Sequence, residues 1–212
     1  MNYLCRKNMS AIQIKLSLTE ESLFCRSKWW GNPDIPQDFQ FDDSLMFLCQ
    51  IRCDELSRFD EKGVFPNKGM LYFFCDIAYY LGYYDEFDPP GGPLWDEDYV
   101  KVYYVEDVDE RTFRQIIFDD DYFPNIKERR IDFEKVGDNT DGHKLLGKPF
   151  QFEYEDWDSP CEGWMNLLQV DSDDDVDYNL MFMDMGMLYI IINPNDLKIR
   201  DFSKVKAYLY ST

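Results

Sequence analysis

The side chains best suited to chemistry in this chain are carboxylates that follow an apolar segment. Asp171, Asp173 and Asp175 alternate within the acidic run 171–177. Alternating carboxylates also begin the calcium loop of EF-hands, but that loop needs glycine at its sixth position and glutamate at its twelfth. Valine and phenylalanine stand at those positions here, which excludes an EF-hand. Two hypotheses remain: an irregular Ca²⁺ or Mg²⁺ site formed by these three aspartates, or a solvated loop in which Asp171 bonds turn amides.

Histidine and cysteine offer little for catalysis or zinc binding. His143 is the only histidine, and none of the six cysteines belongs to a C-x-x-C pair. Zinc sites and Ser-His or Cys-His catalysis need such groups in combination. Neighbouring carboxylates are expected from composition alone, so they do not single out a glycosidase pair. We therefore predict no catalytic residue, and we predict free buried thiols in a reducing compartment, the cytoplasm.

The charge of the chain is acidic and unevenly distributed. Asp and Glu number 42 against 22 Lys and Arg, which gives a net charge of −20. Residues 1–30 carry +3 and residues 193–212 carry +2, so residues 31–192 carry −25. Such a field repels nucleic acid and anionic membranes, and it attracts cations or a basic protein. Solubility alone is the competing explanation.

The segments that would position these side chains occur twice. Three short patterns recur in the same order: two apolar residues with G-x-P, then L-x-Q-aliphatic, then G-M-L-Y with two apolar residues. They lie at 29–33 and 145–149, at 48–51 and 167–170, and at 69–74 and 186–191. The offsets are 116, 119 and 117 residues. A register held within a few residues over this length indicates a duplicated unit.

The recurring segments predict a mainly β fold (β-rich α+β), because Tyr, Phe and β-branched residues favour strands. We expect a single roll-like domain at 11–212, formed by an internal duplication of a three- to four-strand unit, with a few short helices. Residues 1–10 would be an N-terminal extension. The first repeat would span 11–105, an insertion 106–142, and the second repeat 143–212.

Period-two patterns and apolar runs place the individual strands of this fold. The predicted strands lie at 11–18, 45–51, 70–75, 100–105 and 205–210. A short helical turn is expected at 52–59. An amphipathic helix is expected at 109–118, because its apolar residues fall on one side.

Polar and aromatic residues of the repeated segments predict a binding site where the two repeats meet. Gln50 and Gln169 occupy matched positions within apolar strands. They either bond a loop backbone or the other copy, or they line a shared cleft. Nearby tryptophans either fill the core or form an aromatic groove. The predicted seam site comprises Trp29, Trp30, Gln50, Trp164, Gln169 and Asp171.

The same segments resemble a known family. Residues 27–33 with Pro36 resemble the S-K-aromatic-G-G-x-P opening of the YwqG-like family (DUF1963), a domain of unknown function. Residues 47–51 and 68–74 are similar to its F-L-x-Q-I/L and K-G-x-L-x-F-F strands. The second half matches through residues 146–149, 167–173 and 184–189, with Asp196, Leu197 and the closing strand after them, so the resemblance covers about 11–210. Trp30 stands where the family usually has glycine.

The resemblance implies a mainly β, roll-like single domain built by duplication, and it carries no established activity. Some relatives are associated with bacterial toxin–immunity gene clusters, which favours binding over catalysis.

Together these observations predict a non-enzymatic, acidic protein-interaction module that binds a basic partner protein and is immunity-protein-like. The alternative is a small-ligand- or divalent-metal-binding enzyme with its site at the seam between the repeats. We expect no cofactor other than the Ca²⁺ or Mg²⁺ considered above, and no nucleic-acid partner. No apolar run approaches the ~20 residues of a membrane span, so no membrane association is expected. The oligomeric state is left open.

Overall fold

One antiparallel sheet of ten strands forms the framework of the protein in a computed structural model, which describes residues 10–82, 99–117, 126–150, 163–174, 178–182 and 186–210. In sheet order its strands are β14 (Lys206–Tyr210), β13 (Met187–Ile192), β10 (Met165–Asp171), β9 (Lys144–Leu145), β1 (Ala11–Ser17), β8 (Arg129–Val136), β2 (Lys28–Trp29), β4 (Met46–Arg52), β5 (Met70–Cys75) and β6 (Val100–Val105). The fold is therefore mainly β, as predicted.

Smaller elements cover parts of this sheet. Two two-stranded sheets pair β3 (Asp34–Pro36) with β7 (Phe113–Gln115), and β11 (Asp173–Asp174) with β12 (Asn179–Leu180). The short helices are α1 (Cys53–Leu56), α2 (Ile77–Tyr80) and α4 (Pro194–Lys198). No helix of the described residues has the length and apolar character needed to cross a membrane.

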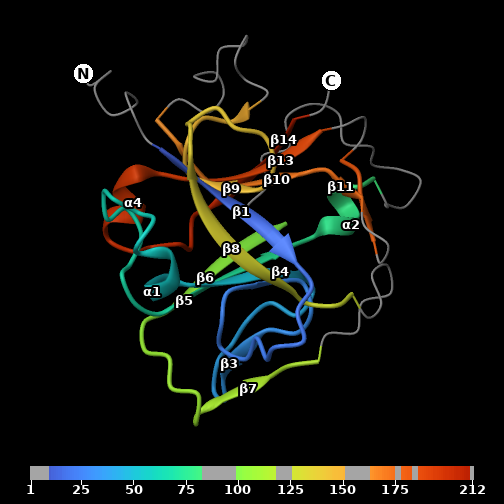
Figure 1. The fold of residues 1–212 in the computed structure, drawn as a ribbon, viewed down its shortest axis with the longest axis vertical. Helices are drawn as coiled ribbons and strands as arrows, with labels where there is room; N and C mark the ends of the chain where they lie inside the picture. Colours follow the sequence, from blue (N-terminus) through green and yellow to red (C-terminus); the bar gives the residue numbers. More distant parts are fainter. Residues whose placement is uncertain are drawn as a thin grey trace.

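β1 and β8 hold the centre of the sheet. They pair along all seven residues of β1, from Ala11 opposite Val136 to Ser17 opposite Arg130. In Figure 1 they cross the view diagonally, with β4, β5 and β6 below them and β10, β13 and β14 above. Outward from this pair, the strands follow the chain order β2-β4-β5-β6 on one side and β9-β10-β13-β14 on the other. The two arms therefore correspond strand by strand, while the duplication itself stays a prediction.

The sheet curls around one large apolar core, to which both arms and the central pair contribute. Alternation along the strands sends one set of side chains inward. The inward set includes Ile12, Ile14, Ile51, Leu71, Phe73, Leu168, Val170, Leu188 and Ile190. A second, smaller cluster lies on the outer face of β4 and β5, where Tyr72 and Phe74 pack against Ile35 and Phe113. A third lies on the outer face of β13, around Tyr189 and Tyr208.

Most of the predicted strands are confirmed. β5 and β6 have the predicted bounds, and β1, β4 and β14 begin or end within one residue of them. The helical turn expected at 52–59 is present as α1. Short apolar runs bounded by turn residues thus locate these strands well.

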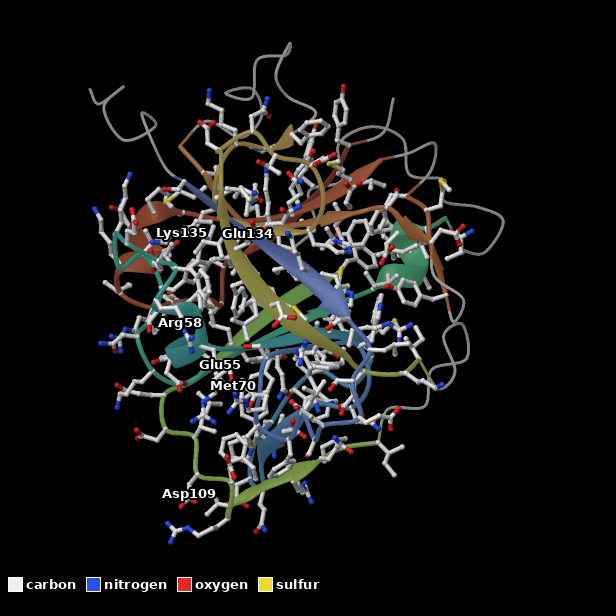
Figure 2. All side chains as sticks on the ribbon, viewed as in Figure 1. Glu55, Arg58, Met70, Asp109, Glu134 and Lys135 are labelled. Carbon is white, nitrogen blue, oxygen red and sulfur yellow. The ribbon has the colours of Figure 1, made fainter. Side chains whose placement is uncertain are left out.

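The helix predicted at 109–118 is wrong. Asp109 instead closes a turn in which its carboxylate accepts a hydrogen bond from Arg111 N at 3.1 Å. After this turn, which Figure 2 shows at the end of the molecule by β7, residues 113–115 pair with β3. The segment is extended because pairing with β3 satisfies its backbone and buries Phe113 in the outer cluster. Periodicity within one segment does not report such a partner.

The stretch 106–142, interpreted from the sequence as an insertion, contains β7 and the central strand β8. The sequence pattern did not predict β8, because the strand contains the exposed charged residues Asp132, Glu134 and Lys135. Ile131 of the same strand is buried in the core. The two arms consequently meet along β1 and β8.

Candidate functional site

Gln50 is buried on the outer side of β4, where its amide organises the loop that precedes the strand. Its Oε1 accepts a hydrogen bond from Asp34 N at 2.9 Å. Its Nε2 donates to Arg26 O and to Asp34 Oδ2, both at 2.8 Å. Lys28 Nζ also lies 2.8 Å from Asp34 Oδ2, with both side chains fully buried. Gln50 therefore belongs to a closed polar cluster under the outer face.

Gln169 makes the same two loop contacts in the other arm. Its Oε1 accepts from Phe150 N at 3.1 Å, and its Nε2 donates to Gly142 O at 2.8 Å. Phe150 and Gly142 lie 116 residues after Asp34 and Arg26, the offset of the repeated segment. These contacts are the loop-backbone bonds weighed from the sequence. In the sheet, β9, β1, β8 and β2 lie between the strands of the two glutamines, so the structure does not bring them together.

Lys144 is a buried lysine that the sequence analysis missed. It lies 116 residues after Lys28, yet its Nζ donates to the carbonyls of Thr140 at 2.5 Å and Asp138 at 3.3 Å. Burial lowers the pKa of this amine to about 8, against the opposing effect of nearby carboxylates. Its position directly before the repeated segment is the signal that marks it.

Trp29, His143 and Asp171 converge between β2 and β9. The rings of Trp29 and His143 stack with centroids 4.6 Å apart. His143 Nδ1 accepts a hydrogen bond from Asp171 N at 3.0 Å. The lone pair of the neutral ring is therefore used at Nδ1, and the proton lies on Nε2. That Nε2 faces Asp173 Oδ2 at 3.7 Å, a polar contact longer than a hydrogen bond.

The predicted metal ligands make protein contacts where the structure describes them. Asp171 Oδ2 accepts from Gly142 N at 2.8 Å and Oδ1 from Ser172 N at 2.7 Å, the turn-amide role considered above. Asp173 Oδ2 accepts from Tyr178 OH at 2.5 Å. Polar contact with His143, and then the bond from Tyr178, lower the pKa of the Asp173 carboxyl. Asp175 lies outside the described residues, among which no group of three His, Cys, Asp or Glu side chains is placed to hold a metal.

These residues line an open groove of about 470 Å³ beside β1. One wall is the end of β1, and the other is formed by the loop residues before β9 and after β10. Its lining comprises Gln13, Ile14, Leu16, Ser17, Leu18, Arg129, Gly142, His143, Asp171, Ser172, Asp173 and Tyr178. We take this groove as the candidate functional site, because histidine, arginine, tyrosine and aspartate side chains converge there on an accessible hollow.

The groove collects some of the predicted site residues and not others. Asp171 and Asp173 line it, and Gln169 supports it through Gly142. Trp29 lies behind His143, and Trp30 packs against Tyr178 with ring centroids 5.6 Å apart. The remaining members lie elsewhere: Gln50 is in its own cluster, and Trp164 packs on the outer face with Lys206 Nζ 5.4 Å from its ring centroid.

Most lining residues were not predicted, among them His143, Arg129 and Tyr178. His143 carries a usable signal, since it is the only histidine and adjoins the repeated segment. Arg129 lies in a charged stretch without a motif, and Tyr178 is marked only by following the acidic run 171–177. Arg129 Cζ lies 5.9 Å from the Tyr178 ring centroid, a contact between segments about fifty residues apart in the chain.

Comparison with known proteins supports the resemblance described above. A family model described as "Domain of unknown function (DUF1963)" matches residues 27–209. No match is found among curated proteins. The matched range runs from β2 into β14 and contains strands of both arms of the sheet, whereas β1, which forms one wall of the groove, precedes it. The chain therefore belongs to the DUF1963 family, whose function is unknown.

Proposed function

We propose that this chain is a non-enzymatic binding module that recognises a basic protein partner, in the manner of an immunity protein. The observation that carries the proposal is that many lysine and arginine side chains of this chain are paired with its own carboxylates. In the described residues, eleven lysines and arginines form ion pairs with carboxylates of the same chain. With a net charge of −20, the carboxylates left over set a negative outward field. Such a field steers a basic partner to the surface.

The chemistry of the groove favours binding over catalysis. His143 offers a donor at Nε2 and no free lone pair, and Asp171 is engaged by two backbone amides. Burial raises the pKa of the Cys25 and Cys53 thiols to about 12, so they are poor nucleophiles at neutral pH. The four cysteines in the described part of the chain are free and buried, which supports a cytoplasmic location.

A direct binding measurement tests the proposal. The full chain is immobilised, and purified proteins of similar size and graded pI are passed over it in 20 mM and 500 mM NaCl. We expect saturable binding of basic proteins that weakens at least tenfold at the higher salt, because the Debye length falls from ~20 Å to ~4 Å. Neutral and acidic proteins serve as controls.

The competing enzyme hypothesis predicts a different result. Ca²⁺ or Mn²⁺ would raise the melting temperature in a saturable way, and Asp171→Asn would abolish the effect. That result, or equal binding of basic and acidic proteins, would contradict the proposal.

A further inference from the structure

The edge of β1 that faces the groove is only partly paired. β8 pairs with all seven residues of β1, whereas β9 pairs with only Ile12 and Gln13. One further bond joins Ile14 N to His143 O at 2.8 Å. Backbone groups alternate between the two edges of a strand, so the N–H and C=O of Leu16 point to this same edge. No strand of the described residues lies beside them.

Local geometry ends the pairing at this point. Gly142 has φ +76°, a left-handed conformation that glycine adopts at little cost. Its N–H is held by Asp171 Oδ2 and its C=O by Gln169 Nε2. These bonds turn the segment before β9 away from β1. The open edge is thus maintained by hydrogen-bonded residues, of which Gln169 is buried.

The matched position in the other arm is filled. Phe133 of β8 lies 117 residues after Leu16, and Phe59 packs on it with ring centroids 5.9 Å apart. Lys135 Nζ, on the part of β8 labelled in Figure 2, bonds Glu61 Oε1 at 2.6 Å. Tyr178 lies 119 residues after Phe59 and is its counterpart in the predicted second repeat. Its ring packs on Trp30 instead. That difference leaves the groove over Leu16 open.

The lining indicates which segment fits. Leu18 at the end of β1 is 60% exposed, and with Leu16 it offers an apolar contact. The Asp173 carboxylate, 35% exposed at its side chain, offers an ionic one. Exposed strand edges are normally covered or blunted because they recruit other strands. An added strand gains main-chain bonds from the edge and specificity from its alternating side chains.

We propose that the β1 edge in this groove binds an extended segment of the partner protein, one that alternates apolar and basic residues and adds to the sheet beside β1. The proposal rests on the proposed function, since it takes the partner to be basic. It adds where the partner docks and in which conformation.

A peptide probe tests the docking mode. The probe is acetyl-Thr-Lys-Val-Lys-Val-Lys-Thr-amide, titrated into the ¹⁵N-labelled full chain. We expect saturable shifts of the Leu16 and Leu18 amides, and slower hydrogen exchange at Leu16. Two N-methylated versions carry the methyl groups on either the lysine or the valine amides, which lie on opposite edges of the strand. One version should lose binding at least tenfold while the other retains it, because only one edge faces β1.

Matched variants test the location. Leu18→Lys should weaken the peptide at least tenfold by removing an apolar contact and adding repulsion. Ile199→Lys makes the same change at a residue that is 72% exposed after α4, and it should leave binding unchanged. Circular dichroism and thermal melting establish that both variants fold.

The outcomes separate this inference from the proposed function. Salt-sensitive binding that leaves Leu16 and Leu18 unperturbed, or that both methylated peptides lose equally, would overturn the docking edge and leave the function standing. If neither the peptide nor any basic protein binds, both fail. A concentration-dependent dimer that Leu18→Lys disrupts would assign the edge to a second copy of the chain, which also overturns the proposal.

Discussion

At the scale of single residues, the two arms bury equivalent polar groups but neutralise them differently. Lys28 meets Asp34 and Glu128, whereas the hydrogen-bond partners of Lys144 among the described residues are carbonyl oxygens. A buried ammonium without a directly bonded carboxylate carries a larger desolvation penalty. Lys144 is therefore a place where the fold gives up stability at neutral pH.

The lowered pKa of Lys144 predicts how that penalty depends on pH. The pKa is about 8 in the folded chain and about 10.4 in an unfolded one. Between these values the unfolded state binds more protons, so the free energy of unfolding contributed by Lys144 rises with pH. Relative to Lys144→Met, wild type should gain about 2 kcal/mol from pH 7 to pH 10. Urea unfolding of both proteins measures the difference, and a flat or falling difference would refute the prediction.

The sequence identified part of the candidate site because some of its signals are local. The turn-amide role weighed for Asp171 follows from its place at the end of a strand, and the structure shows those bonds. The loop contacts of Gln169 follow from a polar residue inside an apolar strand. Arg129 and Tyr178 join the groove through the path of the whole sheet. No spacing in the chain encodes that path.

At the scale of elements, the repeated G-x-P segments share an unusual backbone. Trp30 and Leu146 have φ +59° and +60°, and the glycines that follow both have φ +72°. A left-handed conformation is costly for side chains with a Cβ, which explains the glycine usual in the family where this chain has Trp30. Trp30 is retained in the core by burial and by its contact with Tyr178.

Gly147 should tolerate no side chain. An added Cβ would lie 2.6 Å from Asp138 O and 2.7 Å from Ala11 Cβ, at φ +72°. We expect Gly147→Ala to lower the free energy of unfolding by about 3 kcal/mol, from strain plus collision. Gly63→Ala is the matched control, because Gly63 has φ +59° but nothing within 4 Å of its added Cβ. Gly63→Ala should lower the free energy of unfolding by only about 1 kcal/mol. If urea unfolding showed equal losses for the two variants, a steric collision at Gly147 would not be the cause.

Strands were predicted correctly where the apolar pattern of the segment itself indicates a strand. Prediction failed where the strand forms only because a segment distant in the sequence pairs with it. β5 is buried at every position and is read directly from its apolar run. β8 alternates charged and apolar residues, and its identity depends on β1, more than a hundred residues away. The helix expected at 109–118 fails for the same reason, since β3 supplies the pairing.

At the scale of the whole molecule, the offset of 116 to 119 residues connects contacts as well as sequence. The loop bonds of Gln50 and Gln169 correspond, and both β4 and β10 have an irregular register at matched positions, between Phe47 and Cys49 and between Asn166 and Leu168. Duplication predicts such agreement. The arms differ where Phe59 and Tyr178 pack, and that difference creates the groove.

The negative charge that is proposed to attract a partner should also strain the isolated protein. With a net charge of −20 at pH 7, carboxylates repel one another in the folded state, and salt screens that repulsion. Salt weakens the exposed ion pairs too, but each contributes only ~0–1 kcal/mol. We therefore expect the melting temperature at pH 7 to rise by about 3 °C between 20 mM and 500 mM NaCl, which corresponds to about 1 kcal/mol. Near the sequence pI of about 4.3, the net charge is close to zero, so salt should not raise the melting temperature. A salt-dependent rise of equal size at both pH values would show that screening of net charge is not the cause.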